Sequence, residues 1–165
     1  MDDRRRRFEA QALPHLDAAY NLARWLSRSP ADADDIVQDA MLRAFRAFDG
    51  FRGGDARAWL LAIVRNCWIS AGRATRRRGH TMLDEDMADV GPDPEVSAIQ
   101  SGHRRRLEAM IARLPDDFRE VLILREMEDM SYREIAEITG CPIGTVMSRL
   151  ARARASLREF MKEGA

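Results

Sequence analysis

Apolar residues recur at intervals of three and four through almost the whole chain, with one interruption. This spacing is the period of amphipathic α-helices, and the alternation that marks β-strands is nearly absent. The interruption is the segment HTMLDEDMADVGPDPEVSA, in which glycine, two prolines and a run of acidic residues oppose regular packing. We therefore predict an all-α fold of two small helical domains, at 8–79 and 101–163, joined by a flexible acidic linker at 80–100.

The charges of the chain cancel overall but are separated by segment. Lys and Arg together number 27, as do Asp and Glu, so no net field draws the whole protein toward nucleic acid. Residues 65–79 carry five arginines and no acid, whereas residues 81–97 carry six acids and no base. Any binding of nucleic acid must come from local surfaces. Arginine supplies nearly all the positive charge, which suits phosphate and base-edge recognition but also follows from a genome rich in G and C.

Three helices are predicted in the first domain. The first presents an apolar face over 13–26, and the second begins near Ser29 or Asp32 as N-cap, with Pro30 in its first turn. Acidic residues at the start of this second helix favour the positive end of its dipole. A loop with glycines at 50–54 follows, and Asp55 is the expected N-cap of a third helix that ends in a run of arginines.

The sharpest local signal lies in residues 131–160. Ser131 and Glu134 have the spacing of a capping box, and Gly140 is placed to end the short helix that they begin. Pro142 then opens a longer helix with one apolar stripe and several arginines on its other sides. A short helix, a tight turn and a longer basic helix predict a helix-turn-helix, which binds DNA with its second helix in the major groove. An ordinary helical hairpin with a solvated arginine face is the alternative.

Several classes of site and location are disfavoured. Cys67 and Cys141 are far apart and lack a cluster of His or Cys around them, so we predict buried thiols, no disulfide and no metal site, with oxidant sensing by either cysteine left open. His15, His80 and His103 lie in different segments without a nucleophile motif or phosphate loop. We therefore expect no catalytic residue, no cofactor and no small-molecule substrate. No window approaches the roughly 18 apolar residues that span a bilayer, which predicts a cytoplasmic protein without membrane insertion.

Three stretches resemble the extracytoplasmic-function sigma factors, the small promoter-recognition subunits of bacterial RNA polymerase. They are DADDIVQDAMLRAF, AWLLAIVRNCW and LPDDFREVLILREMEDMSYREIAEITGCPIGTVMSRLARAR, in this order, and the resemblance covers nearly the whole chain. It implies a sigma region 2 domain that binds core polymerase and the minus 10 promoter element, followed by a sigma region 4 domain that binds the minus 35 element. Such a protein is not itself an enzyme but directs one to promoters.

The resemblance also assigns residues to each surface of the first domain. The polar surface that docks on the clamp helices of the largest polymerase subunit corresponds to Asp35, Gln38, Asp39 and Arg43. Relatives hold a flipped-out base of the minus 10 element near the glycine loop, and the expected DNA-binding residues there are Arg52, Asp55, Arg65, Asn66, Arg73, Arg76 and Arg77. Trp59 and Trp68 lie in an apolar helix, so we expect them to pack in the core rather than to stack on bases.

The second domain carries the expected minus 35 surface. Its residues are Arg133, Thr145, Ser148, Arg149, Arg152 and Arg154. One position departs from the family, since many relatives carry a basic residue where this chain has Met147. The promoter sequence therefore does not transfer from a relative.

The family further implies an anti-sigma factor as partner and a role in a stress or extracytoplasmic response. In relatives the acidic linker threads through polymerase channels, although a flexible, soluble tether explains its composition equally well. A second hypothesis is a free-standing helix-turn-helix repressor or activator, whose dimers bind duplex DNA alone. A sigma factor of zero net charge instead needs polymerase to align its two domains. An enzyme is the third and least favoured hypothesis.

Overall fold

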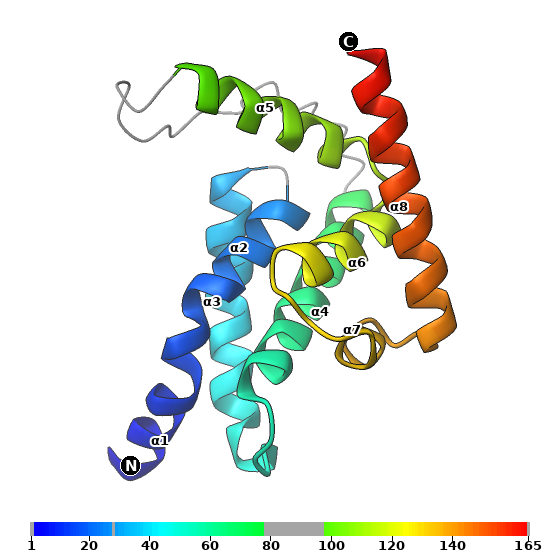
Figure 1. Cartoon of the computed structure of the whole chain (residues 1–165). Helices are drawn as coiled ribbons and strands as arrows, with labels where there is room; N and C mark the ends of the chain where they lie inside the picture. Colours follow the sequence, from blue (N-terminus) through cyan, green and yellow to red (C-terminus); the bar gives the residue numbers. More distant parts are fainter. Residues whose placement is uncertain (1, 28, 78–97, 165) are drawn as a thin grey trace.

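The computed structural model describes residues 2–27, 29–77 and 98–164, and these residues form helices and no strand (Figure 1). The predicted all-α class is confirmed. In chain order the helices are α1 (Asp2–Ala12), the 3₁₀ turn η1 (Leu13–His15), α2 (Leu16–Leu26), α3 (Pro30–Ala47), the 3₁₀ turn η2 (Phe48–Gly50), α4 (Ala56–Arg77), α5 (Ala98–Ala112), α6 (Asp116–Glu126), α7 (Tyr132–Thr139) and α8 (Ile143–Glu163).

Helices α1–α4 form the N-terminal domain, in which α2, α3 and α4 pack on one another. The predicted start of α3 is confirmed, because the Ser29 hydroxyl accepts a hydrogen bond from the Asp32 N–H at 3.1 Å and Pro30 occupies the first turn. The predicted helix over 13–26 instead begins with a 3₁₀ turn that contains Pro14, and α2 follows from Leu16. Proline lacks the N–H that a continuous helix from α1 into α2 would use at this point.

Helices α5–α8 form the C-terminal domain, and α7 and α8 are the predicted helix-turn-helix. Both hydrogen bonds of the capping box are present, each 3.1 Å long, between Ser131 and Glu134. Gly140 ends α7 with φ of +70°, a left-handed conformation that glycine adopts without steric cost. Pro142 is the N-cap residue of α8, which runs along one edge of the molecule (Figure 1).

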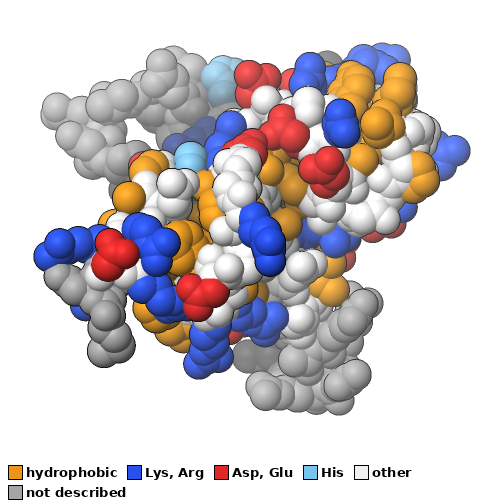
Figure 2. Space-filling model, turned by 90° about the horizontal axis from the view of Figure 1, so that it is seen from below, with side chains coloured by type: hydrophobic (Ala, Val, Ile, Leu, Met, Phe, Trp, Pro, Cys, Tyr) orange, Lys and Arg blue, Asp and Glu red, His pale blue; other side chains and the backbone are white. Residues whose placement is uncertain are grey.

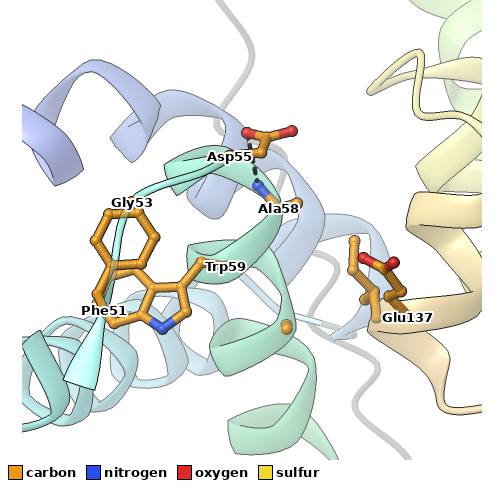
Figure 3. Close-up of a pocket in the computed structure, with 8 residues that line it drawn as sticks. Phe51, Gly53, Asp55, Ala58, Trp59 and Glu137 are labelled. Carbon is orange, nitrogen blue, oxygen red and sulfur yellow. Dashed lines mark hydrogen bonds between the residues drawn. The ribbon is translucent and has the colours of Figure 1, made fainter.

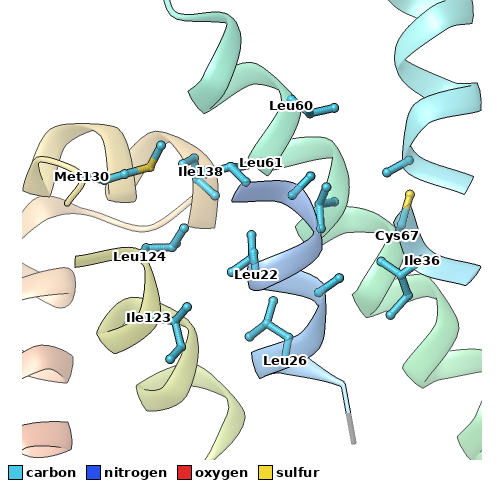
Figure 4. Packing of buried hydrophobic residues seen from close by; sticks show 14 of the residues in the cluster. Leu22, Leu26, Ile36, Leu60, Leu61, Cys67, Ile123, Leu124, Met130 and Ile138 are labelled. Atoms are coloured by element: carbon cyan, nitrogen blue, oxygen red, sulfur yellow. The ribbon is translucent and has the colours of Figure 1, made fainter. Parts of the chain in front are cut away.

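One hydrophobic core extends through both domains. Leu22 and Leu26 of α2 lie opposite Ile123 and Leu124 of α6, and Leu61 of α4 lies near Ile138 of α7 (Figure 4). All six side chains are buried. Burial of each such side chain contributes about 1.5–3 kcal/mol, so this apolar contact holds the two domains against each other.

Charged side chains add to the contact between the domains. Arg57 of α4 donates a hydrogen bond to Glu128 at 3.2 Å, and Arg65 of α4 pairs with Glu120 of α6. Arg119 of α6 reaches the Leu26 carbonyl oxygen at 3.4 Å. The linker predicted for 80–100 lies mostly outside the described residues, and α5 already begins at Ala98 within its range.

Candidate nucleic-acid interface

The recognition helix α8 presents a distinct outer face. Val146, Leu150 and Ala153 are buried, because α8 packs on α6 and α7 through this side. The opposite side, which carries the predicted residues Ser148 and Arg152, is exposed. Helices of this motif bind DNA through such a face, so α8 has the geometry that major-groove binding requires.

Two of the predicted α8 arginines have acidic partners on α6. Arg154 donates from Nε and Nη2 to Glu126 Oε1, at 3.0 and 2.6 Å, and this hydrogen bond raises the pKa of Arg154. Arg149 Nη2 lies 3.8 Å from Asp117 Oδ2. These acidic partners offset part of the positive charge of α8.

The remaining predicted residues of this surface lie at the start of α8 and on α7. Ser148 donates its hydroxyl hydrogen bond to the Thr145 carbonyl oxygen at 3.0 Å, and Thr145 is half-buried. Arg133 is exposed on α7, where its Nε lies 3.8 Å from Glu137 Oε1. The structure thus brings the predicted minus 35 residues together on one helix-turn-helix, and their contacts with DNA stay a prediction.

The glycine loop before α4 has a defined conformation. Gly53 and Gly54 have φ of +89° and +95°, which side-chain-bearing residues rarely adopt. Asp55 caps α4 as predicted, since its Oδ1 accepts hydrogen bonds from the N–H groups of Arg57 and Ala58 at 3.0 and 3.2 Å. Burial alone would raise the pKa of Asp55, but the hydrogen bonds from the N–H groups of Ala58 and Arg57 and the positive charge of Arg57 lower it.

A cavity of about 320 Å³ lies beside this loop (Figure 3). Phe51, Gly53, Asp55 and Trp59 line it from the N-terminal domain, and Glu137 lines it from α7. The rings of Phe51 and Trp59 are 4.7 Å apart between centroids. The cavity therefore combines aromatic walls with a carboxylate acceptor, which are the groups that bind an unstacked base.

Trp59, which lines this cavity, was predicted to pack in the core. Its ring is partly buried and packs against the core, as predicted, and it also contributes to the cavity wall. Its position four residues after the Asp55 cap is the sequence signal that places it there, because the first turn of a helix faces the loop that precedes it.

The other predicted minus 10 residues differ in accessibility. Arg52 and Asn66 are exposed, whereas Arg65 is directed to Glu120 at the contact between the domains. Burial raises the pKa of Glu120, and the hydrogen bond from Arg65 only partly opposes this shift. Arg73, Arg76 and Arg77 belong to the last turns of α4, and their side chains lie outside the described part of the structure.

The predicted polymerase-docking residues share one side of α3. Asp35, Gln38 and Arg43 are exposed, and Arg43 Nη2 lies 3.0 Å from Asp39 Oδ2 one turn away. Leu42 joins them with 57% of its surface exposed. This leucine was not predicted as a site residue, although its position four residues after Gln38 marks the same helix face.

Among the described residues on the face seen from below, Lys and Arg side chains lie among Asp, Glu and hydrophobic ones (Figure 2). Within the described residues, no group of three or more His, Cys, Asp or Glu side chains has the arrangement of a metal site. None of the described helices is both long and apolar enough to span a membrane.

Comparison with known proteins assigns the two domains to known regions. Residues 13–78 match the family described as Sigma-70 region 2, and residues 104–157 match Sigma-70, region 4. The chain is 36% identical over 144 residues to the ECF RNA polymerase sigma-E factor of Haemophilus influenzae, with 81% of this chain and 75% of the relative covered. It is 34% identical over 150 residues to the ECF RNA polymerase sigma factor SigE of Mycolicibacterium smegmatis, which covers 89% of this chain and 58% of the relative's length.

Solved structures give the same result. The sigma factor RpoE in complex with the anti-sigma factor NepR, from Bartonella quintana, superimposes with a TM-score of 0.80 at 32% identity, over 94% of this chain and 96% of that chain. CnrH in complex with the cytosolic domain of CnrY superimposes with a TM-score of 0.72 at 26% identity, over 98% of this chain and 91% of that chain. The protein belongs to the family of ECF sigma factors of RNA polymerase.

Proposed function

We propose that this chain is a sigma subunit that directs bacterial core RNA polymerase to specific promoters in the cytoplasm. In this role α3 docks on the core enzyme, the glycine loop and α4 bind the opened minus 10 element, and α8 reads the minus 35 element. The observation that carries the proposal is the presence, in one chain, of a region 2 match and a region 4 match that contains an exposed helix-turn-helix. The subunit supplies promoter choice and strand opening, and no catalytic group.

The close packing of the two domains in the free protein supports a change of conformation before promoter binding. The minus 10 and minus 35 elements lie about 25 base pairs apart, which is about 85 Å along duplex DNA. The 21-residue helix α8 is only about 32 Å long, and Glu137 of α7 lines the same cavity as the glycine loop. We propose that the domains separate when the core enzyme binds.

Regulation by an anti-sigma factor is part of the proposal. Among the similar structures, RpoE was solved with the anti-sigma factor NepR bound, and CnrH was solved with the cytosolic domain of CnrY bound. We propose that a corresponding anti-sigma factor binds this chain and holds the two domains together. Purification of the chain from its native host, followed by transcription assays with each copurified protein, tests this point: a specific inhibitor supports it, and the absence of one contradicts it.

The central test is binding to core RNA polymerase. Fluorescently labelled protein should bind the core enzyme tightly, and an Asp35→Ala/Asp39→Ala double variant should bind at least tenfold more weakly. Asp17→Ala/Glu159→Ala is the matched control, because it removes two exposed carboxylates outside α3. A folded chain that does not bind core polymerase but binds duplex DNA alone would instead be a free-standing regulator.

A further inference from the structure

One side of α4 lies against the C-terminal domain and carries two arginines. Arg57, Leu61 and Arg65 follow one another at intervals of four residues, so they lie on the same side of the helix. Leu61 is fully buried and lies near Ile138 of α7 (Figure 4). The side chains of Arg57 and Arg65 are only 33% and 17% exposed. The C-terminal domain therefore covers this side of α4 from one arginine to the other.

Each of the two arginines is paired with a buried carboxylate of the C-terminal domain. Arg57 Nη2 lies 3.2 Å from Glu128 Oε2, and Arg65 Nε lies 2.8 Å from Glu120 Oε2. Both glutamates are buried. A buried ion pair is often no more stabilising than well-packed apolar residues of similar volume. Stability of the domain contact alone therefore does not account for two buried carboxylates that face two arginines.

A third carboxylate of the C-terminal domain lies beside the glycine loop. Glu137 of α7 lines the same cavity as the rings of Phe51 and Trp59, and it faces them across this cavity (Figure 3). A DNA strand carries a negative charge at every phosphate, so a carboxylate at this place repels it. A strand that approaches α4 and the glycine loop would meet arginines that are already paired and a carboxylate of its own sign.

The covered arginines have the chemistry and the spacing to bind a DNA backbone. A guanidinium binds phosphate through the same fork of N–H groups that binds a carboxylate. Arg57 and Arg65 are eight residues apart, or about 12 Å along the helix, which allows each to contact a different phosphate. Asn66, beside Arg65, is already exposed. Carboxylate and phosphate would compete for the same two groups.

We propose that the C-terminal domain inhibits the binding of single-stranded DNA by α4 in the free protein. Glu120 and Glu128 take the places that two phosphates of the opened minus 10 strand occupy once the domains separate. The inference rests on the proposed function and adds a form of regulation that lies within the chain itself. It also assigns Arg57, which was not among the expected site residues, to the surface that binds the minus 10 strand.

The test measures DNA binding by the free full chain, without polymerase. The probe is a fluorescent 20-nucleotide single strand of random sequence, and anisotropy reports its binding. Glu120→Gln/Glu128→Gln keeps the shape of both side chains but removes the charges that hold the arginines, and it should bind the probe about tenfold more tightly than the native chain. Equal affinity of the double variant and the native chain would overturn the proposal.

The matched control is Glu159→Gln/Glu163→Gln. It changes the net charge of the chain by the same amount at two exposed positions near the end of α8. Its affinity should stay within about twofold of the native value, because surface charges far from a binding site act weakly through salt solution. A gain in the control equal to that of Glu120→Gln/Glu128→Gln would show that net charge alone is responsible, and it would contradict the proposal.

The salt dependence of binding identifies the groups that the strand contacts. Each phosphate neutralised on a single strand adds about 0.7 to the slope of log affinity against log salt concentration, so the slope of the double variant should be steeper by about 1.4. Arg57→Ala added to the double variant should remove about half of this increase. A gain in affinity that leaves the slope unchanged, or that Arg57→Ala does not reduce, would overturn the assignment of these arginines.

A single variant keeps the test available if the double variant does not fold. Glu128→Gln leaves the pair of Arg65 and Glu120 intact and should bind the probe about threefold more tightly than the native chain. If neither variant gains affinity while the native chain binds core polymerase, the inhibition is wrong and the sigma function stands. If the native chain does not bind core polymerase, the proposed function is wrong and this inference fails with it.

Discussion

The Arg65 guanidinium donates two hydrogen bonds to the Glu120 carboxylate, from Nε at 2.8 Å and from Nη2 at 3.2 Å. The two residues lie 55 positions apart in the chain and belong to different domains. Glu120 is only 1% exposed. Because Arg65 supplies the hydrogen bonds to this buried carboxylate, the stability of the contact between the domains depends on that arginine.

Loss of Arg65 should therefore destabilise the protein strongly. Arg65→Ala leaves Glu120 buried and unpaired, and we expect it to lower the free energy of unfolding by about 3 kcal/mol. Urea unfolding followed by circular dichroism measures this change. Arg52→Ala, which removes an exposed arginine, is the control and should cost less than about 0.5 kcal/mol. Equal midpoints for both variants would show that the Arg65–Glu120 pair does not stabilise the fold.

Binding of core polymerase should separate the two domains. Donor and acceptor dyes on Asp17→Cys and Glu159→Cys, two exposed positions in different domains, should show high energy transfer in the free protein and low transfer in the holoenzyme. Cys141→Ser is included so that the dyes attach only at the two new cysteines. The same labelled protein with Asp35→Ala/Asp39→Ala should keep high transfer when core polymerase is added. Unchanged transfer in a complex that has formed would contradict the separation.

Local sequence signals predicted much of the fold and of the helix-turn-helix. The Ser29 cap, the Ser131–Glu134 capping box and the Gly140 terminus are short-range features, because the atoms that form their hydrogen bonds lie within four residues of one another. Their geometry follows from residue type and spacing alone. Element boundaries near these signals were accordingly predicted well.

The contact between the domains was not predictable in the same way. Glu120 occupies a position that reads as a solvated helix residue, and its partner Arg65 read as a DNA-binding arginine beside Asn66. Nothing in the sequence near either residue specifies a pairing across 55 positions. The same reason explains why Glu137 of α7 was not expected beside the glycine loop, where it lines the cavity.

The Asp55 cap should make the stability of α4 depend on pH. The pKa of Asp55 is lowered from its ordinary value of 3.8, so the folded protein binds the proton less readily than the unfolded chain does. Its stabilisation is then present above about pH 4 and is lost as the pH falls through the folded pKa. Asp55→Ala should cost about 1 kcal/mol at pH 7 and progressively less at lower pH.

Asp55→Asn separates capping from titration, since asparagine caps helices as well as aspartate but does not ionise. This variant should be close to the native protein in stability at pH 7 and should lack the acid-dependent loss. Unfolding midpoints in urea, measured from pH 3 to pH 7, test both variants. A constant difference between Asp55→Ala and the native protein over this range would show that the carboxylate charge is not involved.

The two cysteines should differ in reactivity. Cys67 is 2% exposed, and burial, together with the nearby Asp39 carboxylate, raises its pKa to about 11. Only about 0.1% of such a thiol is ionised at pH 8, and the thiolate is the reactive form. Cys141 is half-exposed in the turn of the helix-turn-helix, with its Sγ 3.1 Å from the Thr139 hydroxyl.

Iodoacetamide at pH 8 should therefore modify one cysteine of the native protein, and peptide mass spectrometry should identify it as Cys141. The Cys141→Ser variant should stay unmodified until denaturant is added. Modification of Cys67 in the native state at the rate of an ordinary exposed thiol would show that the core between α3 and α4 opens readily, and oxidant sensing by Cys67 would then gain a physical basis.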